Sequence, residues 1–154
     1  MPIAPIICSP HVVEVLQRYG WFPDRSIEIQ AILAEWQLRE IARYPIAAEV
    51  LRSLGGIDID YTQSDDATLC PFARVDRVAF LPGGQREEGY QYRERNLGLK
   101  LFPIGDAGDA DMFLDASGRV YASFGPICII GDNIDDALNG LIAGRKWVRI
   151  SDGR

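Results

Sequence analysis

The stretch Pro45-Ile-Ala-Ala-Glu-Val-Leu-Arg-Ser-Leu-Gly-Gly-Ile-Asp-Ile-Asp-Tyr61 changes its hydrophobic period halfway along. Before Gly55-Gly56 the apolar residues recur at the spacing of a helix, as Ala47, Val50, Leu51 and Leu54. After the two glycines, which are typical of a helix end, the period falls to two, with Ile57, Ile59 and Tyr61 alternating with aspartates. The stretch therefore predicts a helix from Pro45 followed directly by a strand with one buried face.

Helices are also predicted on the N-terminal side of this stretch. Ser9 is a suitable N-cap and Pro10 suits the first helical position, with Gly20 placed to end the helix in the left-handed conformation. Between them lies one apolar stripe, formed by Val12, Val15, Leu16 and Tyr19. A second helix is expected from Ser26 to about Tyr44, since Ile29, Ile32, Leu33 and Trp36 follow the same period.

Strands and a final helix are predicted on the C-terminal side. We expect strands over 99–105, 111–115 and 127–130, with the turn 116–118 leading into a hairpin strand over 119–124. Asp132 or Asn133 can cap a last helix that ends at Gly144. The segment 62–97 is less patterned: Val75, Val78, Phe80 and Leu81 suit a strand, and 86–95 suits a loop or a short solvated helix.

Together these elements indicate one α+β domain over residues 1–154, with a mainly antiparallel central sheet, N-terminal helices and a C-terminal helix. The expected order is three helices, a run of strands, then one helix. No glycine-rich dinucleotide fingerprint, P-loop or nucleophile elbow is present.

Composition narrows the class of function. The net charge of −6 and pI near 4.7 argue against direct nucleic-acid binding. We find no signal peptide and no apolar run long enough for a membrane span, and so expect a cytoplasmic protein. Three isolated cysteines and one histidine, His11, offer neither a zinc motif nor a nucleophile–base pair. We therefore expect no cofactor, no metal and no catalysis.

Short motifs spaced along most of the chain resemble the SUKH superfamily, and within it the third subgroup of immunity proteins. They are Gly20-Trp21 with Pro23 and Arg25, Leu54-Gly-Gly-Ile57, Phe102-Pro-Ile-Gly105, Asp115 with Gly118-Arg-Val-Tyr121, and Gly131-Asp132 leading into Ala137-Leu138 and Gly144. Each motif alone is unspecific, and the resemblance lies in their order and spacing. Residues 62–97 lie outside it.

This resemblance implies an α+β fold and a role in bacterial polymorphic toxin systems. In such systems an immunity protein binds a cognate toxin domain, often a nuclease or a deaminase, and protects the producing cell or its kin. Two alternatives stay open: a regulatory or scaffold module of the same fold that binds another host protein, and a small metal-dependent hydrolase built on the loop from Asp106 to Asp111.

The candidate binding residues are mainly acidic. Seven aspartates and a single arginine lie between Gly105 and Gly140, a local charge of −6. Solvated helix caps, a divalent-metal site and a docking surface for a basic toxin are the three interpretations. For the docking surface we select Asp106, Asp109, Asp111, Asp132, Asp135 and Asp136.

Trp21 is a further candidate for partner binding, because tryptophan is a favoured interface anchor. The structural interpretation is that Trp21 folds back on the first helix and that Arg25 binds a helix C-terminus.

Overall fold

The computed structural model describes residues 9–30, 44–60, 77–80 and 87–152. Its helices are α1 (Pro10–Arg18), α2 (Pro45–Leu54), α3 (Glu87–Leu97) and α4 (Ile134–Ala143). Its strands are β1 (Asp58–Asp60), β2 (Arg77–Ala79), β3 (Leu101–Ala107), β4 (Ala110–Asp115), β5 (Val120–Ser123), β6 (Ile127–Gly131) and β7 (Val148–Ser151). Among these helices none is long and apolar enough to cross a bilayer.

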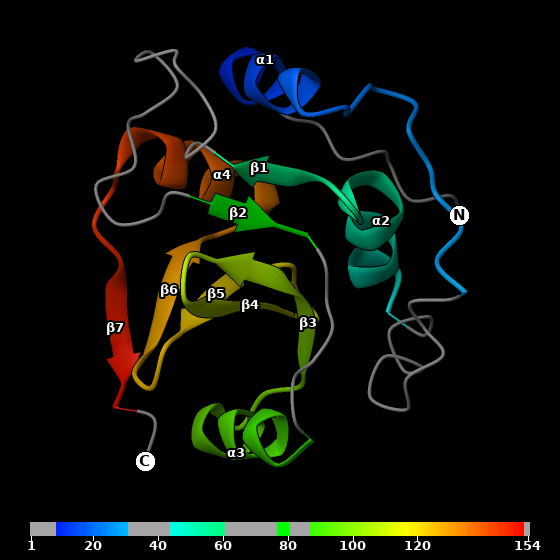
Figure 1. The fold of residues 1–154 in the computed structure, drawn as a ribbon. Coiled ribbons are helices and arrows are strands. Elements are labelled where there is room, and N and C mark those ends of the chain that lie inside the picture. Colours follow the sequence, from blue (N-terminus) through cyan, green and yellow to red (C-terminus); the bar gives the residue numbers. More distant parts are fainter. Residues whose placement is uncertain (1–8, 31–43, 61–76, 81–86, 153–154) are drawn as a thin grey trace.

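The strands form a single antiparallel sheet in which every strand pairs with its neighbours in sequence, from β1 to β7. Figure 1 shows α1, α2 and α4 grouped on one side of the sheet and α3 on the other. The fold is therefore α+β with an antiparallel sheet, N-terminal helices and a C-terminal helix, as the sequence predicted.

The two sides of the sheet are covered unequally. The larger core joins α1, α2 and α4 to residues such as Ile104, Met112, Leu114 and Ala122. The smaller cluster, on the side of α3, contains Leu101, Phe113, Tyr121 and Ile127. We call this second surface the α3 side. Successive residues of a strand point to opposite faces, so the odd-numbered residues 111, 113 and 115 of β4 belong to the α3 side.

Several predicted helix boundaries are confirmed. α1 begins at Pro10 and α2 at Pro45, while Asn133 caps α4 by accepting a hydrogen bond from the Asp136 N–H. Gly144 ends α4 with a left-handed φ of 71°. Ser9 occupies the N-cap position of α1, but its side chain makes no capping hydrogen bond.

The start of the predicted second helix is wrong. Residues 26–30 are not helical, because this segment lies along the end of α2, where the Ile27 N–H donates to the Arg52 carbonyl at 2.9 Å. Ile29 is nevertheless buried, as predicted. The remainder of that helix, including Ile32, Leu33 and Trp36, falls outside the described residues.

The predicted order of elements also needs two corrections. α3 is the solvated helix that was one of two alternatives for 86–95, and because it lies between β2 and β3, a helix interrupts the predicted run of strands. β7 was not predicted. Its burial shows no alternation, because Val148, Arg149 and Ile150 are all exposed on this outermost strand. Of the strand suggested around 75–81, residues 77–79 form β2 and the buried Phe80 follows it, while Val75 and Leu81 lie outside the described residues.

Candidate functional site

The six aspartates predicted to bind a partner fall into two groups. Asp106, Asp109 and Asp111 belong to the hairpin of β3 and β4, and Asp106 and Asp111 lie on the α3 side. The other three, Asp132, Asp135 and Asp136, surround the N-terminus of α4, which packs on the opposite side of the sheet. The two groups differ in what their carboxylates contact.

In the hairpin group, two carboxylates face each other. Asp106 and Asp111 are directly opposite in the register of β3 and β4. Burial and the neighbouring Asp111 raise the pKa of Asp106, although Arg77 acts in the other direction. Carboxylates this close interact unfavourably when both are ionised, because like charges in opposite positions of a ladder repel.

Arg93 of α3 holds one member of this pair. Its Nη1 lies 2.8 Å from Asp111 Oδ2, its Nε donates to Ser123 Oγ at 3.1 Å, and its guanidinium lies 4.9 Å from the centre of the Phe113 ring. Arg93 thereby attaches α3 to the sheet. Asp106 and the exposed Asp109 have no ion pair of comparable length among the described contacts.

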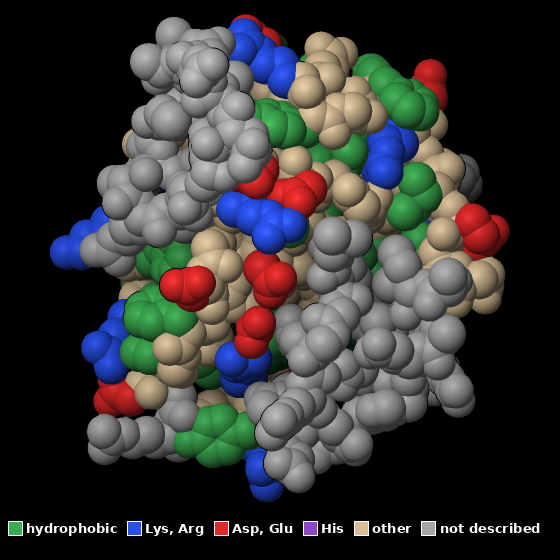
Figure 2. All heavy atoms as spheres, viewed as in Figure 1, with side chains coloured by type: hydrophobic (Ala, Val, Ile, Leu, Met, Phe, Trp, Pro, Cys, Tyr) green, Lys and Arg blue, Asp and Glu red, His purple; other side chains and the backbone are tan. Residues whose placement is uncertain are grey.

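The acidic surface continues across β1 and β2. Arg77 forms a two-pronged pair with Asp58, at 2.9 and 2.6 Å, and this pair lowers the pKa of Asp58. Figure 2 shows red and blue side chains gathered in the middle of this view, over β1 to β4. We call the set the acidic row, and it comprises the aspartates Asp58, Asp60, Asp106, Asp109 and Asp111 with the arginines Arg77 and Arg93.

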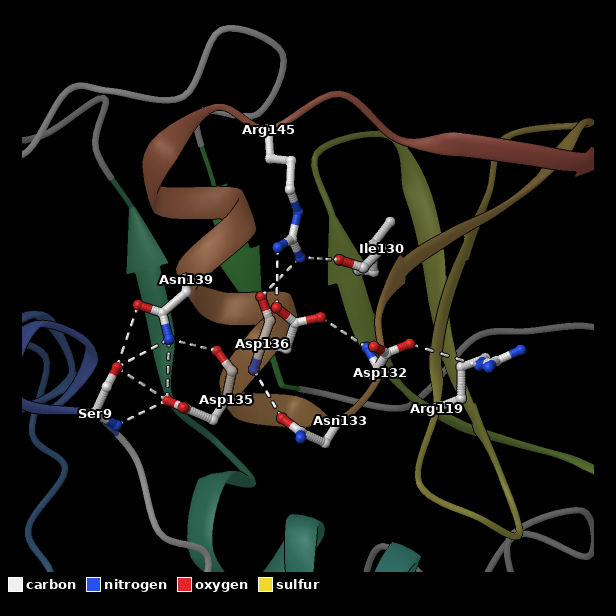
Figure 3. A network of polar contacts seen from close by, with 9 residues as sticks. All are labelled: Ser9, Arg119, Ile130, Asp132, Asn133, Asp135, Asp136, Asn139 and Arg145. Atoms are coloured by element: carbon white, nitrogen blue, oxygen red, sulfur yellow. Dashed lines mark hydrogen bonds and ion pairs between the residues drawn. The ribbon is translucent and has the colours of Figure 1, made fainter.

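The α4 group is engaged within the fold (Figure 3). Asp135 accepts hydrogen bonds from the Ser9 N–H at 2.8 Å and from Ser9 Oγ at 3.2 Å, and Asn139 completes this network. Ser9 precedes α1, so Asp135 fastens the start of α1 to α4 across more than a hundred residues of sequence.

Asp136 has a similar internal role. Its carboxylate accepts from Arg145 Nη1 and from the Asp132 N–H, both at 2.9 Å, and these bonds lower its pKa. Arg145 also donates to the Ile130 carbonyl, which links the end of α4 to β6. Asp132 differs, because its side chain is 80% exposed and lies 3.9 Å from Arg119.

Trp21 is buried in the free chain. It is 5% exposed, and its Nε1 donates to Ser53 Oγ at 3.0 Å. Arg25 donates to the carbonyls of Ser53 and Gly55 at 2.7 Å each, at the C-terminus of α2. Burial lowers the pKa of Arg25. The Arg25 contacts match the structural interpretation of the motif. Trp21 joins the core cluster that contains Val12, Val15 and Leu16 of α1, but its indole hydrogen bond is to α2.

Sequence reasoning missed Asp58, Asp60, Arg77 and Arg93 as members of the acidic row. The alternation of Asp58 and Asp60 with isoleucines marked them as solvent-facing. Only the pairing of β1 with β2, and of β2 with β3, brings them beside the hairpin. No signal in the sequence indicated that α3 would cross the same surface.

Metal ligation was the alternative interpretation of the loop from Asp106 to Asp111. Within the part of the chain that the structure describes, no three His, Cys, Asp or Glu side chains are grouped as metal ligands. The loop is a tight hairpin whose Asp111 binds the guanidinium of Arg93.

Comparison with known proteins gives one match. The family model described as SUKH-3 immunity protein matches residues 8–144. This span includes α1 to α4 and every motif on which the resemblance rested. Neither the curated proteins nor the solved structures gave a match.

Proposed function

Because the chain belongs to the SUKH-3 immunity protein family, we propose that it neutralises a cognate protein toxin by stoichiometric binding, without catalysis. The partner in this proposal is a basic toxin domain, of the nuclease or deaminase kind, that meets the immunity protein in the cytoplasm. Enzymes that act on nucleic acid carry positive surfaces for phosphate, and an acidic protein can occupy such a surface.

The acidic row is the proposed docking surface, and the observation that carries this choice is the opposed pair Asp106 and Asp111. Like charges in opposite positions of a sheet destabilise the fold, by roughly 0.2–1 kcal/mol for a cross-strand pair. Burial, and after it the neighbouring Asp111, raise the pKa of Asp106. A lysine or arginine of the partner, placed beside Asp106, would relieve that repulsion. The partner would bind more tightly because the repulsion is present only in the free protein.

The arginines of the acidic row limit the negative charge that a partner can contact. Arg77 and Arg93 are bonded to Asp58 and Asp111, so the charge available to a partner is concentrated at Asp106 and Asp109. Asp109 is exposed at the tip of the hairpin. Complementary charge of this kind chiefly accelerates encounter, toward about 10⁸–10⁹ M⁻¹s⁻¹ at low salt, which suits an inhibitor that must intercept a toxin quickly.

The α4 aspartates have a smaller part in this proposal. Asp135 and Asp136 are bonded within the fold, to Ser9 and Arg145, and their replacement would disturb the attachment of α1 and the end of α4. Asp132 is exposed and could add to steering from the other side of the sheet. Trp21 would be reached only by a partner that unpacks the turn after α1.

The test uses the variant Asp106→Asn/Asp109→Asn and, as the candidate toxin domain, the product of the adjacent gene. The variant should be at least as stable as the wild type in urea, because Asp106→Asn removes a repulsion. It should associate more slowly in stopped flow, with a flatter dependence of rate on salt. Asp24→Asn/Glu28→Gln is the matched control, since it removes the same charge from exposed positions outside the row.

Equal association rates and equal salt slopes for the two double variants would exclude the acidic row as the docking surface. Failure of the wild-type protein to bind the toxin domain at all would contradict the immunity function with this partner.

A further inference from the structure

The last strand of the sheet combines two exposed features. β7 pairs only with β6 among the strands that the structure describes, and it forms the outer edge of the sheet at the left of Figure 1. Its side chains are exposed although two of them are aliphatic: Val148 is 61% and Ile150 42% exposed. Phe124, in the turn between β5 and β6, is 57% exposed.

Apolar side chains occur on both sides of this edge. Val148 lies opposite Ile129, which packs against the smaller core cluster on the α3 side. On the other side, the partly buried Trp147 packs against the larger core and lies 6.2 Å from the Phe124 ring. Apolar side chains are thus present on both faces of the sheet at this edge, and they are not fully covered by the rest of the chain.

An exposed edge of this kind is a template for another strand, because alternate residues of an edge strand direct their N–H and C=O groups away from the sheet. Soluble proteins usually blunt such edges by keeping them short or charged. β7 is itself short, with four residues and one charge, Arg149, and its register with β6 shifts between Cys128 and Ile127, yet its two aliphatic side chains remain exposed. When a segment is added to such an edge, main-chain hydrogen bonds supply affinity and contacts to alternate side chains supply specificity, and exposed apolar groups beside the edge can make those contacts.

We propose that β7 receives an extended segment of the toxin as an added strand, so that the complex has a continuous sheet. This inference rests on the proposed function and identifies a second contact surface. The segment that fits carries an acidic residue opposite Arg149 and apolar residues on either side of it, which would cover Val148 and Ile150. Arg149 is paired with Asp152 at 2.6 Å, but both side chains are more than half exposed and can exchange partners.

Charge argues for this occupant over a second copy of the chain. Two copies of β7 would pair antiparallel about a two-fold axis perpendicular to the sheet, so that residues of the same face stand opposite one another. Centred on Arg149, the pairing places two guanidinium groups opposite each other. Centred on Ile150, it places each Val148 opposite an aspartate, Asp152. Neither of these two registers suits self-association. A toxin segment with an acidic residue between apolar neighbours would instead complement the charge of Arg149 and the apolar side chains beside it.

The experiment measures hydrogen exchange of the β7 amides in the full-length protein, free and bound to the adjacent-gene toxin domain carrying an inactivating substitution. Binding should slow exchange at residues 148–151. Val148→Lys and Arg149→Glu should each raise Kd, by about tenfold or more, as expected for an interface anchor. Leu99→Lys is the matched control, because Leu99 is a similarly exposed apolar residue (43%) that precedes β3, which β4, β5 and β6 separate from β7 in the sheet, and the Kd of this variant should not change.

Each outcome separates the two proposals. A complex in which β7 exchange is unchanged, or in which Val148→Lys and Leu99→Lys behave alike, would overturn strand addition and leave the proposed function in place. A homodimer in sedimentation equilibrium that Val148→Lys dissociates would show a second copy to be the occupant, and would also overturn it. A wild-type protein that forms no complex with the toxin domain would overturn both.

Discussion

Removal of the Asp115 carboxylate should be among the most damaging single changes outside the apolar core. Asp115 ends β4 and is 8% exposed. Its Oδ1 accepts from the N–H groups of Ser117 and Arg119, at 2.9 and 3.1 Å, and from the Ser117 hydroxyl. Its Oδ2 accepts from the Tyr121 hydroxyl at 2.8 Å. The carboxylate therefore organises the turn that joins β4 to β5.

The size of the effect follows from which donors lose their partner. In Asp115→Ala the turn donors can bond to water, because Ala116 and Ser117 are exposed. The Tyr121 hydroxyl cannot easily do so, since Tyr121 is 2% exposed, and an unsatisfied buried donor costs about 1–3 kcal/mol. With roughly 1 kcal/mol more for the loosened turn, we expect a loss of about 2–4 kcal/mol.

The assay is urea denaturation followed by circular dichroism, with Asp115→Ala, Asp115→Asn and Tyr121→Phe compared in one series. Asp115→Asn keeps an acceptor for the turn and should lose less than Asp115→Ala. Tyr121→Phe removes the buried donor itself and should cost about 0.5–1.5 kcal/mol. Asp24→Ala, an exposed aspartate, is the control. If Asp115→Ala loses no more stability than this control, the carboxylate does not organise the turn and our reasoning is refuted.

Three further predictions concern the fold. Leu51 is fully buried in the larger core, so Leu51→Ala should lower the free energy of unfolding by about 2–5 kcal/mol. Ile46→Ala, on the exposed side of α2, should lower it much less. Equal decreases for the two variants would contradict the packing of α2. A Cβ at Gly131 would stand 2.5 Å from the Ala137 Cα, so Gly131→Ala should cost about 1–3 kcal/mol in thermal unfolding, and an unchanged Tm would contradict this contact between β6 and α4. Burial alone would raise the pKa of Asp115, but hydrogen bonds from Ser117, Tyr121 and Arg119 outweigh burial, and the pKa is lowered. The Asp115 carboxylate therefore stabilises the fold above the unfolded-state pKa, near 4, and this stabilisation is lost as the pH falls below that value. In a urea series from pH 6 to 2, the free energy of unfolding should fall more steeply for the wild type than for Asp115→Asn.

Local patterns in the sequence predicted the elements whose signals lie within one turn of chain. Pro10 and Pro45 begin helices, and Asn133 and Gly144 bound α4, because capping depends on neighbouring residues alone. The change of period at Gly55-Gly56 likewise predicted β1, since Ile59 must be buried while Asp58 and Asp60 face away from the core. Segment 26–30 went wrong because a tertiary bond, from Ile27 to Arg52, competes with the local preference for a helix.

The sequence by itself determined that this chain is an acidic α+β protein with a concentration of aspartates in its C-terminal half, and its spaced motifs indicated the SUKH family. Only the tertiary structure decided which aspartates are available to a partner. Asp135 and Asp136 are neighbours in sequence with no local signal that distinguishes them, yet Asp135 binds Ser9 and Asp136 binds Arg145. Asp106, in contrast, lies opposite another carboxylate, Asp111, because of the register of β3 and β4. The physical reason is that a carboxylate's role depends on the donors that reach it, and those donors come from distant parts of the chain. The exposed edge of β7 was invisible for the same reason, because a strand is an edge only with respect to the sheet around it.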